Sequence, residues 1–346
     1  MPGHKPPRAG LHGIVGFLFI VGVVVASPTQ SRAADTPFAE TLRSIVKVHA
    51  VIPGDARTAH SLGTEREGNG VVIGDDGLVL TIGYLILEAS AVQVTVGTGE
   101  PSPAEIVAYD HATGFGLIRA PSLAGVKSLP LGRSADLAKG VRALAVSAEG
   151  TSRRSPVTPV AVVSRREFAG YWEYLLDSAI YTRPYHDSYG GAALLDSEGA
   201  LVGIGSLFVN DAETGDEAAP GNLFVPIDLL KPILGELVEK GRSSAPANPW
   251  LGLYAGEAQG RVFVRRVARG GPAETAGVKP GDIIIGVGGR RVAGLADFYR
   301  KIWSRGAAGI EVGVDILPIG SKDLAIENVS IRSLDRHNWL KLRRQQ

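Results

Sequence analysis

Residues 68–81 read Gly-Asn-Gly-Val-Val-Ile-Gly-Asp-Asp-Gly-Leu-Val-Leu-Thr, and this stretch indicates a β fold. The apolar runs Gly70–Ile73 and Leu78–Thr81 flank the turn sequence at 74–77. Short apolar runs on both sides of a Gly/Asp turn are typical of a tight antiparallel hairpin. Residues 196–199 (Asp-Ser-Glu-Gly) also lie between apolar runs, so they predict a second hairpin.

Similar short runs recur along the chain up to about residue 225, separated by Gly, Asp, Ser and Pro. This spacing is typical of an antiparallel barrel or sandwich. The composition agrees, because 45 glycines and 6% aromatic residues suit a turn-rich β protein better than a helical bundle. The other predicted strands are Ser44–Ile52, Ala91–Val96, Ala104–Val107, Gly116–Arg119, Val141–Val146, Val157–Val163, Ala193–Leu195 and Ala200–Ile204.

The pattern changes at Pro226. Apolar residues from Ile227 to Val238 fall at helical spacing, with Pro232 near the start and Gly241 as a C-cap. Residues 242–249 (Arg-Ser-Ser-Ala-Pro-Ala-Asn-Pro) have no apolar periodicity and predict an interdomain linker.

A second unit begins at Trp250. About 85 residues of mixed strands and helices are typical of a small α+β domain. Its predicted strands are Val262–Val267, Ile283–Val287 and Ile310–Ile316, and its predicted helices are Pro272–Ala276 and Leu295–Trp303.

The N-terminus has the features of a secretory signal peptide. Lys5 and Arg8 precede the apolar run Ile14–Ala26, and small residues follow as far as Ala33-Ala34. The run is shorter than the roughly 20 residues of a membrane span, although an uncleaved anchor is the alternative. We therefore expect residues 1–34 to direct export, with cleavage near Ala33 or Ala34.

Charge and cysteine content exclude several classes of partner and site. Without residues 1–34 the chain carries 33 basic and 35 acidic residues, a net charge of −2, which offers no electrostatic basis for binding nucleic acid. The absence of cysteine excludes disulfides, thiol nucleophiles and thiolate metal sites. No metal or nucleotide signature is present, so we expect no cofactor. Residues 334–346 form a basic tail, and its charges at Lys341, Arg343 and Arg344 predict a solvated end rather than a binding patch.

Several motifs occur in order and at consistent spacing over almost 200 residues. They are Gly68–Ile73, Asp76–Thr81, Val107–Asp110, Leu117-Ile118, Leu129–Ser134, Gly140-Val141, Gly190-Gly191, Leu194-Leu195, Val202–Ile204 and Phe224–Ile227. This segment resembles the protease domain of the HtrA (Deg) family. The resemblance implies a trypsin-like double antiparallel β-barrel, which we assign to residues 35–241.

Residues 271–284 (Gly-Pro-Ala-Glu-Thr-Ala-Gly-Val-Lys-Pro-Gly-Asp-Ile-Ile) are the most specific run in the chain. Together with Trp250-Leu251-Gly252-Leu253 they resemble a PDZ domain, which we place at residues 250–333. The resemblance implies that Trp250–Leu253 form the loop that receives a peptide C-terminus. Gly252 allows successive backbone N–H groups to turn toward a carboxylate, and the peptide would add as a strand.

The catalytic positions depart from the family pattern. Tyr84 stands at the position of the histidine, Gly114 at that of the aspartate and Tyr189 at that of the serine nucleophile. Asp187 replaces the glycine whose N–H belongs to the oxyanion hole, which would put negative charge where the mechanism needs attraction. A phenol with a pKa of about 10 is poorly suited to remove a proton near neutral pH. The sequence therefore predicts loss of proteolysis.

Displaced chemistry is the alternative. A shift of one residue would make Ser188 the nucleophile, with His111 as the base from the loop beside Gly114. The consecutive residues His186-Asp187-Ser188 are less suitable, because neighbours on an extended chain point to opposite sides, whereas a triad needs side chains that converge, normally from distant segments.

Three functional hypotheses follow. The first is a catalytically inactive envelope protein, exported to the periplasm, that binds peptide C-termini or unfolded envelope proteins through its PDZ domain in quality control or as a scaffold. The second is an active serine endopeptidase that uses the displaced residues. The third is a structural subunit of a mixed oligomer with active family members. Because family members are commonly trimers built through the N-terminal region of the barrel domain, a homotrimer is also expected.

Overall fold

The computed structural model describes residues 37–149, 155–214, 218–321, 323–340 and 342. Residues 36–346 form one compact unit by their internal contacts. The predicted signal peptide, residues 1–34, lies outside the described residues. No helix among the described residues is long and apolar enough to cross a membrane.

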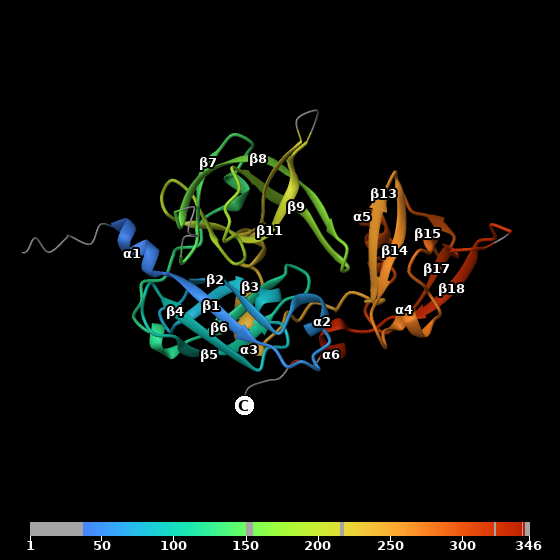
Figure 1. Ribbon diagram of the computed structural model, residues 1–346, viewed down its shortest axis with the longest axis horizontal. Coiled ribbons are helices and arrows are strands. Elements are labelled where there is room, and N and C mark those ends of the chain that lie inside the picture. Colours follow the sequence, from blue (N-terminus) through green and yellow to red (C-terminus); the bar gives the residue numbers. More distant parts are fainter. Residues whose placement is uncertain (1–36, 150–154, 215–217, 322, 341, 343–346) are drawn as a thin grey trace, which may run out of the picture. The chain divides into compact units, whose positions relative to one another are not determined.

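The first part is a closed antiparallel barrel with the strand order β1-β2-β3-β6-β5-β4, closed by the pairing of β1 with β4 (Figure 1). The 74–77 turn joins β2 to β3 as predicted, since Gly70 pairs with Thr81 and Val72 with Val79. The bounds are α1 (Pro37–Arg43), β1 (Ile45–Val51), α2 (Ala59–Leu62), β2 (Glu65–Val72), β3 (Leu78–Ile82), η1 (Gly83–Leu85), β4 (Ala91–Val96), β5 (Ser102–Tyr109) and β6 (Phe115–Arg119).

The second part is another closed antiparallel barrel, with the order β10-β11-β12-β9-β8-β7. Closure leaves no unpaired sheet edge along the barrel. The predicted mainly β, double-barrel fold is therefore confirmed. The bounds are η2 (Pro121–Leu123), η3 (Ser134–Asp136), β7 (Arg142–Val146), β8 (Val157–Gly170), β9 (Tyr174–Arg183), β10 (Ala193–Leu195), β11 (Leu201–Glu213) and β12 (Ala219–Pro226).

The third part is an antiparallel sheet in the order β13-β14-β15-β17-β18, with the short strand β16 paired to β15. Helix α5 contributes Phe298, Tyr299 and Ile302 to its core. This is the predicted small α+β domain. The bounds are β13 (Leu253–Ala258), β14 (Arg261–Val267), α4 (Pro272–Thr275), β15 (Ile283–Val287), β16 (Arg290–Arg291), α5 (Leu295–Trp303), β17 (Glu311–Leu317), β18 (Glu327–Arg332) and α6 (Arg336–Trp339).

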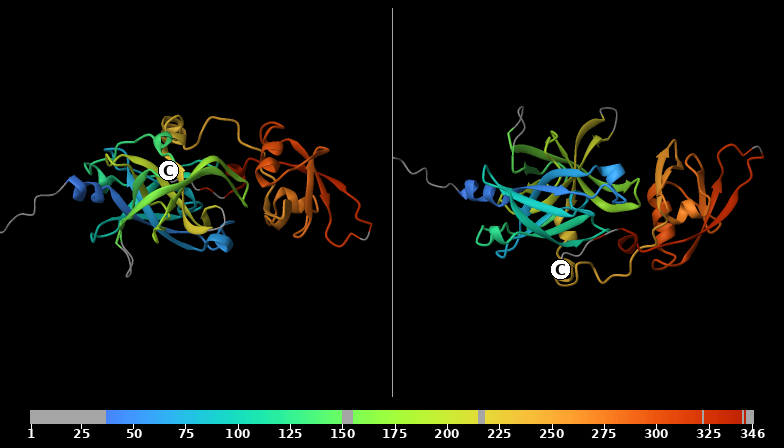
Figure 2. Two further views of the ribbon diagram at one scale, coloured as in Figure 1. Left: turned by 90° about the horizontal axis from the view of Figure 1, so that it is seen from above. Right: turned by 60° about the horizontal axis from the view of Figure 1, so that its bottom comes forward.

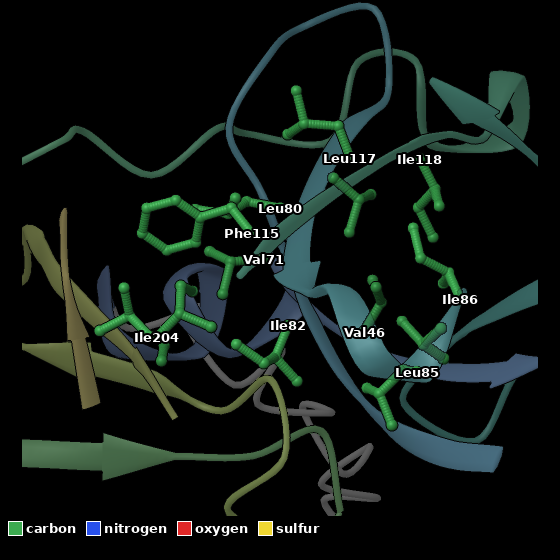
Figure 3. Close-up of a cluster of buried hydrophobic side chains, with 14 of the residues drawn as sticks. Val46, Val71, Leu80, Ile82, Leu85, Ile86, Phe115, Leu117, Ile118 and Ile204 are labelled. Carbon is green, nitrogen blue, oxygen red and sulfur yellow. The ribbon is translucent and has the colours of Figure 1, made fainter. Parts of the chain in front are cut away.

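Aliphatic side chains fill the first barrel. Figure 3 shows Val46, Leu80 and Leu117 gathered with Ile118 in this cluster, and all four are fully buried. Strand β3, which lies between β2 and β6, is buried at every position. Ile204 of β11 belongs to the same cluster, so the core is continuous from one barrel to the next.

Strands β8 and β9 extend beyond the second barrel as a two-stranded hairpin (Figures 1 and 2). Strand β7 pairs with β8 only up to Ala161, and β12 pairs with β9 only from Ile180. Beyond these points the two strands pair with each other as far as Gly170 and Tyr174. The hairpin tip therefore consists of residues 171–173, well away from the barrel ladders.

The predicted helix Ile227–Val238 is divided into η4 (Ile227–Leu229) and α3 (Leu234–Lys240), because Pro232 cannot donate a helical hydrogen bond. The Gly241 cap is confirmed, with φ at 75° and its N–H bonded to the Leu237 carbonyl.

The first residues of the predicted basic tail, 334–346, include a short helix, whereas the solvated end predicted for Lys341, Arg343 and Arg344 lies outside the described residues. Helix α6 packs Trp339 against Trp250, with ring centroids 4.4 Å apart. Arg57 lies over Trp339 at 4.0 Å, and Arg336 donates to the Trp172 carbonyl. Aromatic packing therefore orders this segment.

Candidate functional site

Tyr84, at the histidine position, spans the two barrels. It sits in η1 directly after β3, and its hydroxyl donates to the carbonyl of Ser206 in β11 at 3.0 Å. Burial raises the pKa of Tyr84 far above the usual phenol value, and the neighbouring Tyr189 phenol adds to the effect. A phenol that stays protonated and donates to a backbone carbonyl has no capacity to remove a proton near neutral pH.

A buried polar network fixes the backbone around Tyr84. The Arg66 guanidinium donates to the carbonyls of Tyr84 (2.7 Å) and Leu87 (2.9 Å). It also donates to Thr58 Oγ1, and that hydroxyl donates to the Glu88 carboxylate at 2.7 Å. Burial lowers the pKa of Arg66 to about 10, with Glu88 acting in the opposite direction. These contacts hold the loop in one conformation.

Gly114, at the aspartate position, adopts a left-handed conformation with φ at 78°. A Cβ atom at this position would lie 3.2 Å from the hydroxyl of Tyr174. That hydroxyl donates to the Thr113 carbonyl at 2.6 Å, so the Tyr174 ring occupies the space beside Gly114. An aspartate here would be strained in its backbone and would crowd Tyr174.

Tyr189, at the nucleophile position, lies in a loop that Asn69 holds in place. The Asn69 side-chain amide donates to the carbonyls of Ser188 (2.7 Å) and Gly190 (3.0 Å). Its Oδ1 accepts the N–H of Ala148 at 2.9 Å. The structure brings Tyr84, Asp187, Ser188 and Tyr189 together around one pocket, which also receives Lys47 and Glu67.

The two residues of the displaced-chemistry hypothesis lie in different surroundings. Ser188 lines the pocket with Tyr189, whereas His111 lines a separate cavity with Arg336 and His337. The His111 ring contacts Tyr109 edge-on at 4.4 Å, and its nitrogens have no hydrogen-bond partner among the described residues. Burial and nearby cationic groups, Arg336 first, hold the pKa of His111 well below its usual value. The structure does not bring this imidazole to Ser188.

His186 also serves a structural contact. Its Nδ1 lies 2.8 Å from Thr158 Oγ1, and its backbone N–H donates to Asn222 Oδ1 at 2.6 Å. The residue is 2% exposed, so its ring is buried rather than presented to solvent.

The predicted peptide-binding loop has the backbone geometry that a carboxylate requires. Gly252 has φ at 76°, and the N–H groups of Leu251 and Leu253 on either side both point at one carboxylate. The carboxylate is the side chain of Glu173, whose two oxygens accept these bonds at 2.9 Å each. Trp250 is buried beneath this loop and pairs with Leu334 through two backbone hydrogen bonds.

Glu173 is the residue at this loop that the sequence did not indicate. It lies at the tip of the β8–β9 hairpin, and strand β9 itself was not predicted. The only local signal is Gly170 followed by Tyr171-Trp172-Glu173, a possible turn between two apolar runs. Nothing in that signal specifies the carboxylate's partner, which lies 78 residues along the chain.

Two family models match the chain. Residues 68–204 match the trypsin-like peptidase domain, and residues 249–327 match the PDZ domain. The chain is 26% identical to the serine protease Do-like HtrA of Bacillus subtilis, over 74% of this chain and 61% of that protein. It is also 26% identical to the serine protease PepD of Mycobacterium tuberculosis, over 78% of this chain and 62% of that protein. The chain thus spans about three fifths of the length of these relatives.

Solved structures agree at the level of the fold. The HtrA-type protease AlgW with tripeptide superposes with a TM-score of 0.50 at 19% identity, covering 89% of this chain and 98% of that one. The serine endoprotease from Yersinia pestis gives 0.50 at 20% identity, covering 87% and 98%. The barrels, the adjoining α+β domain and these matches support an HtrA/DegP-like protein with a trypsin-like peptidase domain and a PDZ domain.

Proposed function

We propose that this protein is a pseudoprotease whose working site is the PDZ carboxylate loop, where it binds peptide C-termini. The observation that carries the proposal is the pair of N–H groups of Leu251 and Leu253, both aimed at one carboxylate. Backbone donors arranged in this way recognise a terminal carboxylate independently of the side chains before it. Its clients would be exposed C-termini of unfolded or damaged envelope proteins.

The cleft between the barrels supports the inactive half of the proposal. A nucleophilic mechanism needs a base within hydrogen-bond reach of the nucleophile and a third group that orients the base. Here the hydroxyl of Tyr84 donates to a backbone carbonyl, and Tyr174 fills the space beside Gly114. Loss of a triad leaves at most about 10³–10⁴-fold acceleration over water, which is negligible beside a functional protease.

The test uses purified residues 35–346. Fluorescence anisotropy with a library of labelled peptides should detect binders with a free C-terminus, and amidation of that terminus should abolish their binding. Equal binding of the amidated peptides would contradict carboxylate recognition.

Casein cleavage and labelling by a serine-directed phosphonate test the inactive half of the proposal. We expect neither, with an active HtrA protease as the positive control. Labelling that disappears in Ser188→Ala would establish the opposing function, an endopeptidase with displaced residues.

Export is a separate part of the proposal and rests on the basic start and apolar run of residues 5–26. Fractionation of cells that express the full chain should place it in the periplasm or at the inner membrane. Recovery in the cytoplasm at full length would contradict it.

A further inference from the structure

The tip of the β8–β9 hairpin contacts β13, the outermost strand of the PDZ sheet. The N–H of Ala255 donates to the backbone carbonyl of Tyr171 at 2.9 Å, and the N–H of Leu253 donates to the side-chain carboxylate of Glu173 at 2.9 Å. The tip therefore occupies backbone donors on the edge of a strand, the kind of edge at which peptides join a sheet.

The Glu173 side chain takes the place of a terminal carboxylate. One of its oxygens accepts from Leu251 and the other from Leu253, so both are bonded to the loop. The residue is 7% exposed, and the interaction is therefore shielded from water. An incoming C-terminal carboxylate would need the same two N–H groups, which the Glu173 carboxyl group already occupies.

Helix α5 encloses the tip from the other side. The Tyr299 hydroxyl donates to the Gly170 carbonyl at 2.8 Å and accepts the N–H of Glu173 at 3.3 Å. Ala169 and Leu175, on the two strands of the hairpin, pack against the core of the PDZ domain. Residues 170–173 thus contact both β13 and α5, the two elements between which a peptide would lie.

The backbone of Glu173 indicates that its side chain is required here. Its φ is 57°, in the left-handed region that glycine and asparagine occupy most easily. A three-residue hairpin loop places such a conformation at this position, where glycine is the usual choice. Glutamate adopts it at a conformational cost, which the two hydrogen bonds to the loop offset.

We propose that residues 171–173 are a built-in ligand of the PDZ groove, which occupies the carboxylate loop through Glu173 and must withdraw before a peptide C-terminus binds. The inference rests on the proposed function and adds its regulation: the affinity for peptides is set by competition within the chain. The apparent dissociation constant then exceeds the intrinsic one by the inverse of the fraction of molecules with the groove open.

Glu173→Gln is the decisive variant. The glutamine amide has nearly the same size but a single acceptor oxygen, and its NH₂ group would face an N–H donor of the loop. The matched control is Asp177→Asn, on the same hairpin. Asp177 pairs with Arg300 of α5 at 2.5 Å, its side chain is 83% exposed, and it does not contact the loop.

Two measurements on residues 35–346 separate the inference from the function. Hydrogen exchange followed by mass spectrometry reports whether the N–H groups at 251–255 are covered without any added peptide. Anisotropy with the labelled free-carboxylate peptides reports their affinity. We expect faster exchange at 251–255 in Glu173→Gln and at least about tenfold tighter peptide binding, with Asp177→Asn close to wild type in both.

The results that would contradict the built-in ligand differ from those that would contradict peptide binding. Unchanged exchange in Glu173→Gln, or peptides that bind wild type and variant equally well, would overturn the built-in ligand while leaving C-terminal recognition intact. Faster exchange in the variant without peptide binding to either protein would overturn the proposed function, and the competition with it.

Discussion

The cleft between the barrels and the carboxylate loop of the PDZ domain meet at two adjacent residues of one hairpin. Tyr174 fills the space beside Gly114, at the position of the absent aspartate. Glu173 fills the PDZ loop. The cleft has exchanged polar side chains for phenols and glycine, whereas the loop keeps its backbone donors and a carboxylate bonded to them.

The difference reflects how each site is built. A triad depends on side chains from distant segments, so a few substitutions remove its chemistry without disturbing the barrel. The carboxylate loop depends on backbone N–H groups and on the left-handed conformation of Gly252, which persist as long as the domain folds. Binding at such a loop can therefore outlast catalysis in the same chain.

The largest expected effect is on the free energy of unfolding, from a change in the buried polar network around Tyr84. Arg66→Met removes the donor to the carbonyls of Tyr84 and Leu87 and the positive charge that interacts with the buried Glu88. Disrupting a buried charged network typically costs about 3–5 kcal/mol. Urea denaturation should show this loss in the free energy of unfolding.

The control for that variant is Arg119→Met. Arg119 forms an exposed pair with Asp76 at 3.0 Å, for which less than about 1 kcal/mol is expected. Equal losses from the two variants would mean that the buried network does not stabilise the cleft.

The next effect is on the pH dependence of stability. Burial raises the pKa of Glu173 to about 7, opposed by the N–H groups of Leu251 and Leu253 and by Arg336. Folding therefore favours the protonated form of Glu173. The contribution of this group to the free energy of unfolding is complete below about pH 4.5 and declines as the pH rises toward 7. The slope for one proton is at most about 1.4 kcal/mol per pH unit.

Denaturation of wild type and Glu173→Gln at pH 5, 6, 7 and 8 isolates this group. The stability difference should change up to about pH 7 and then level off, since the neutral amide cannot titrate. The other titratable and charged groups near this carboxyl are common to both proteins, so their effects cancel in the comparison. These groups are Tyr299 and Arg336, with Asp110, His111, Arg242, Asp335 and His337 around the adjoining cavity. A stability difference that does not change with pH would contradict the raised pKa of Glu173.

A smaller effect should follow Gly252→Ala. The substitution places a Cβ on a residue with φ at 76° and 3.2 Å from Pro272. A left-handed alanine costs about 1–2 kcal/mol, enough to weaken peptide binding about tenfold if the loop changes conformation. Anisotropy measures the affinity.

Gly260→Ala is its matched control, in the turn between β13 and β14. Gly260 has φ at 68° and open space around its Cβ position, so the strain is similar but remote from the loop. An equal loss of affinity in both variants would show that general destabilisation, not loop geometry, is responsible.

Restoring a serine at the nucleophile position should have the smallest effect: we expect no proteolysis above background. Tyr189→Ser should leave casein uncleaved because no imidazole is among the described residues that line the pocket. The triple variant Tyr84→His, Gly114→Asp and Tyr189→Ser should also stay inactive, since Tyr174 crowds position 114. Phosphonate labelling of the triple variant would contradict this account of the cleft.

The sequence alone determined the class of fold and most of its strands. Three local features were predictable, because hydrophobic periodicity, turn residues and the placement of glycines act over a few residues. They are the 68–81 hairpin, the run at 271–284 and helix Leu295–Trp303. The resemblance to a PDZ domain indicated the Trp250–Leu253 loop, and the turn expected at Gly252 is present, with φ at 76°. The substitutions at 84, 114 and 189 could be read directly once the resemblance had aligned them.

Only the tertiary structure decided what those segments contact. Strand β9 was missed because its sequence lacks a simple alternation of apolar and polar residues. Bulges interrupt its pairing with β8, and several consecutive residues are buried. His111 and Ser188 proved to line different cavities, which their spacing along the chain does not reveal. The bond between Glu173 and the carboxylate loop joins residues 78–80 positions apart, and such long-range pairing is set by packing rather than by local pattern.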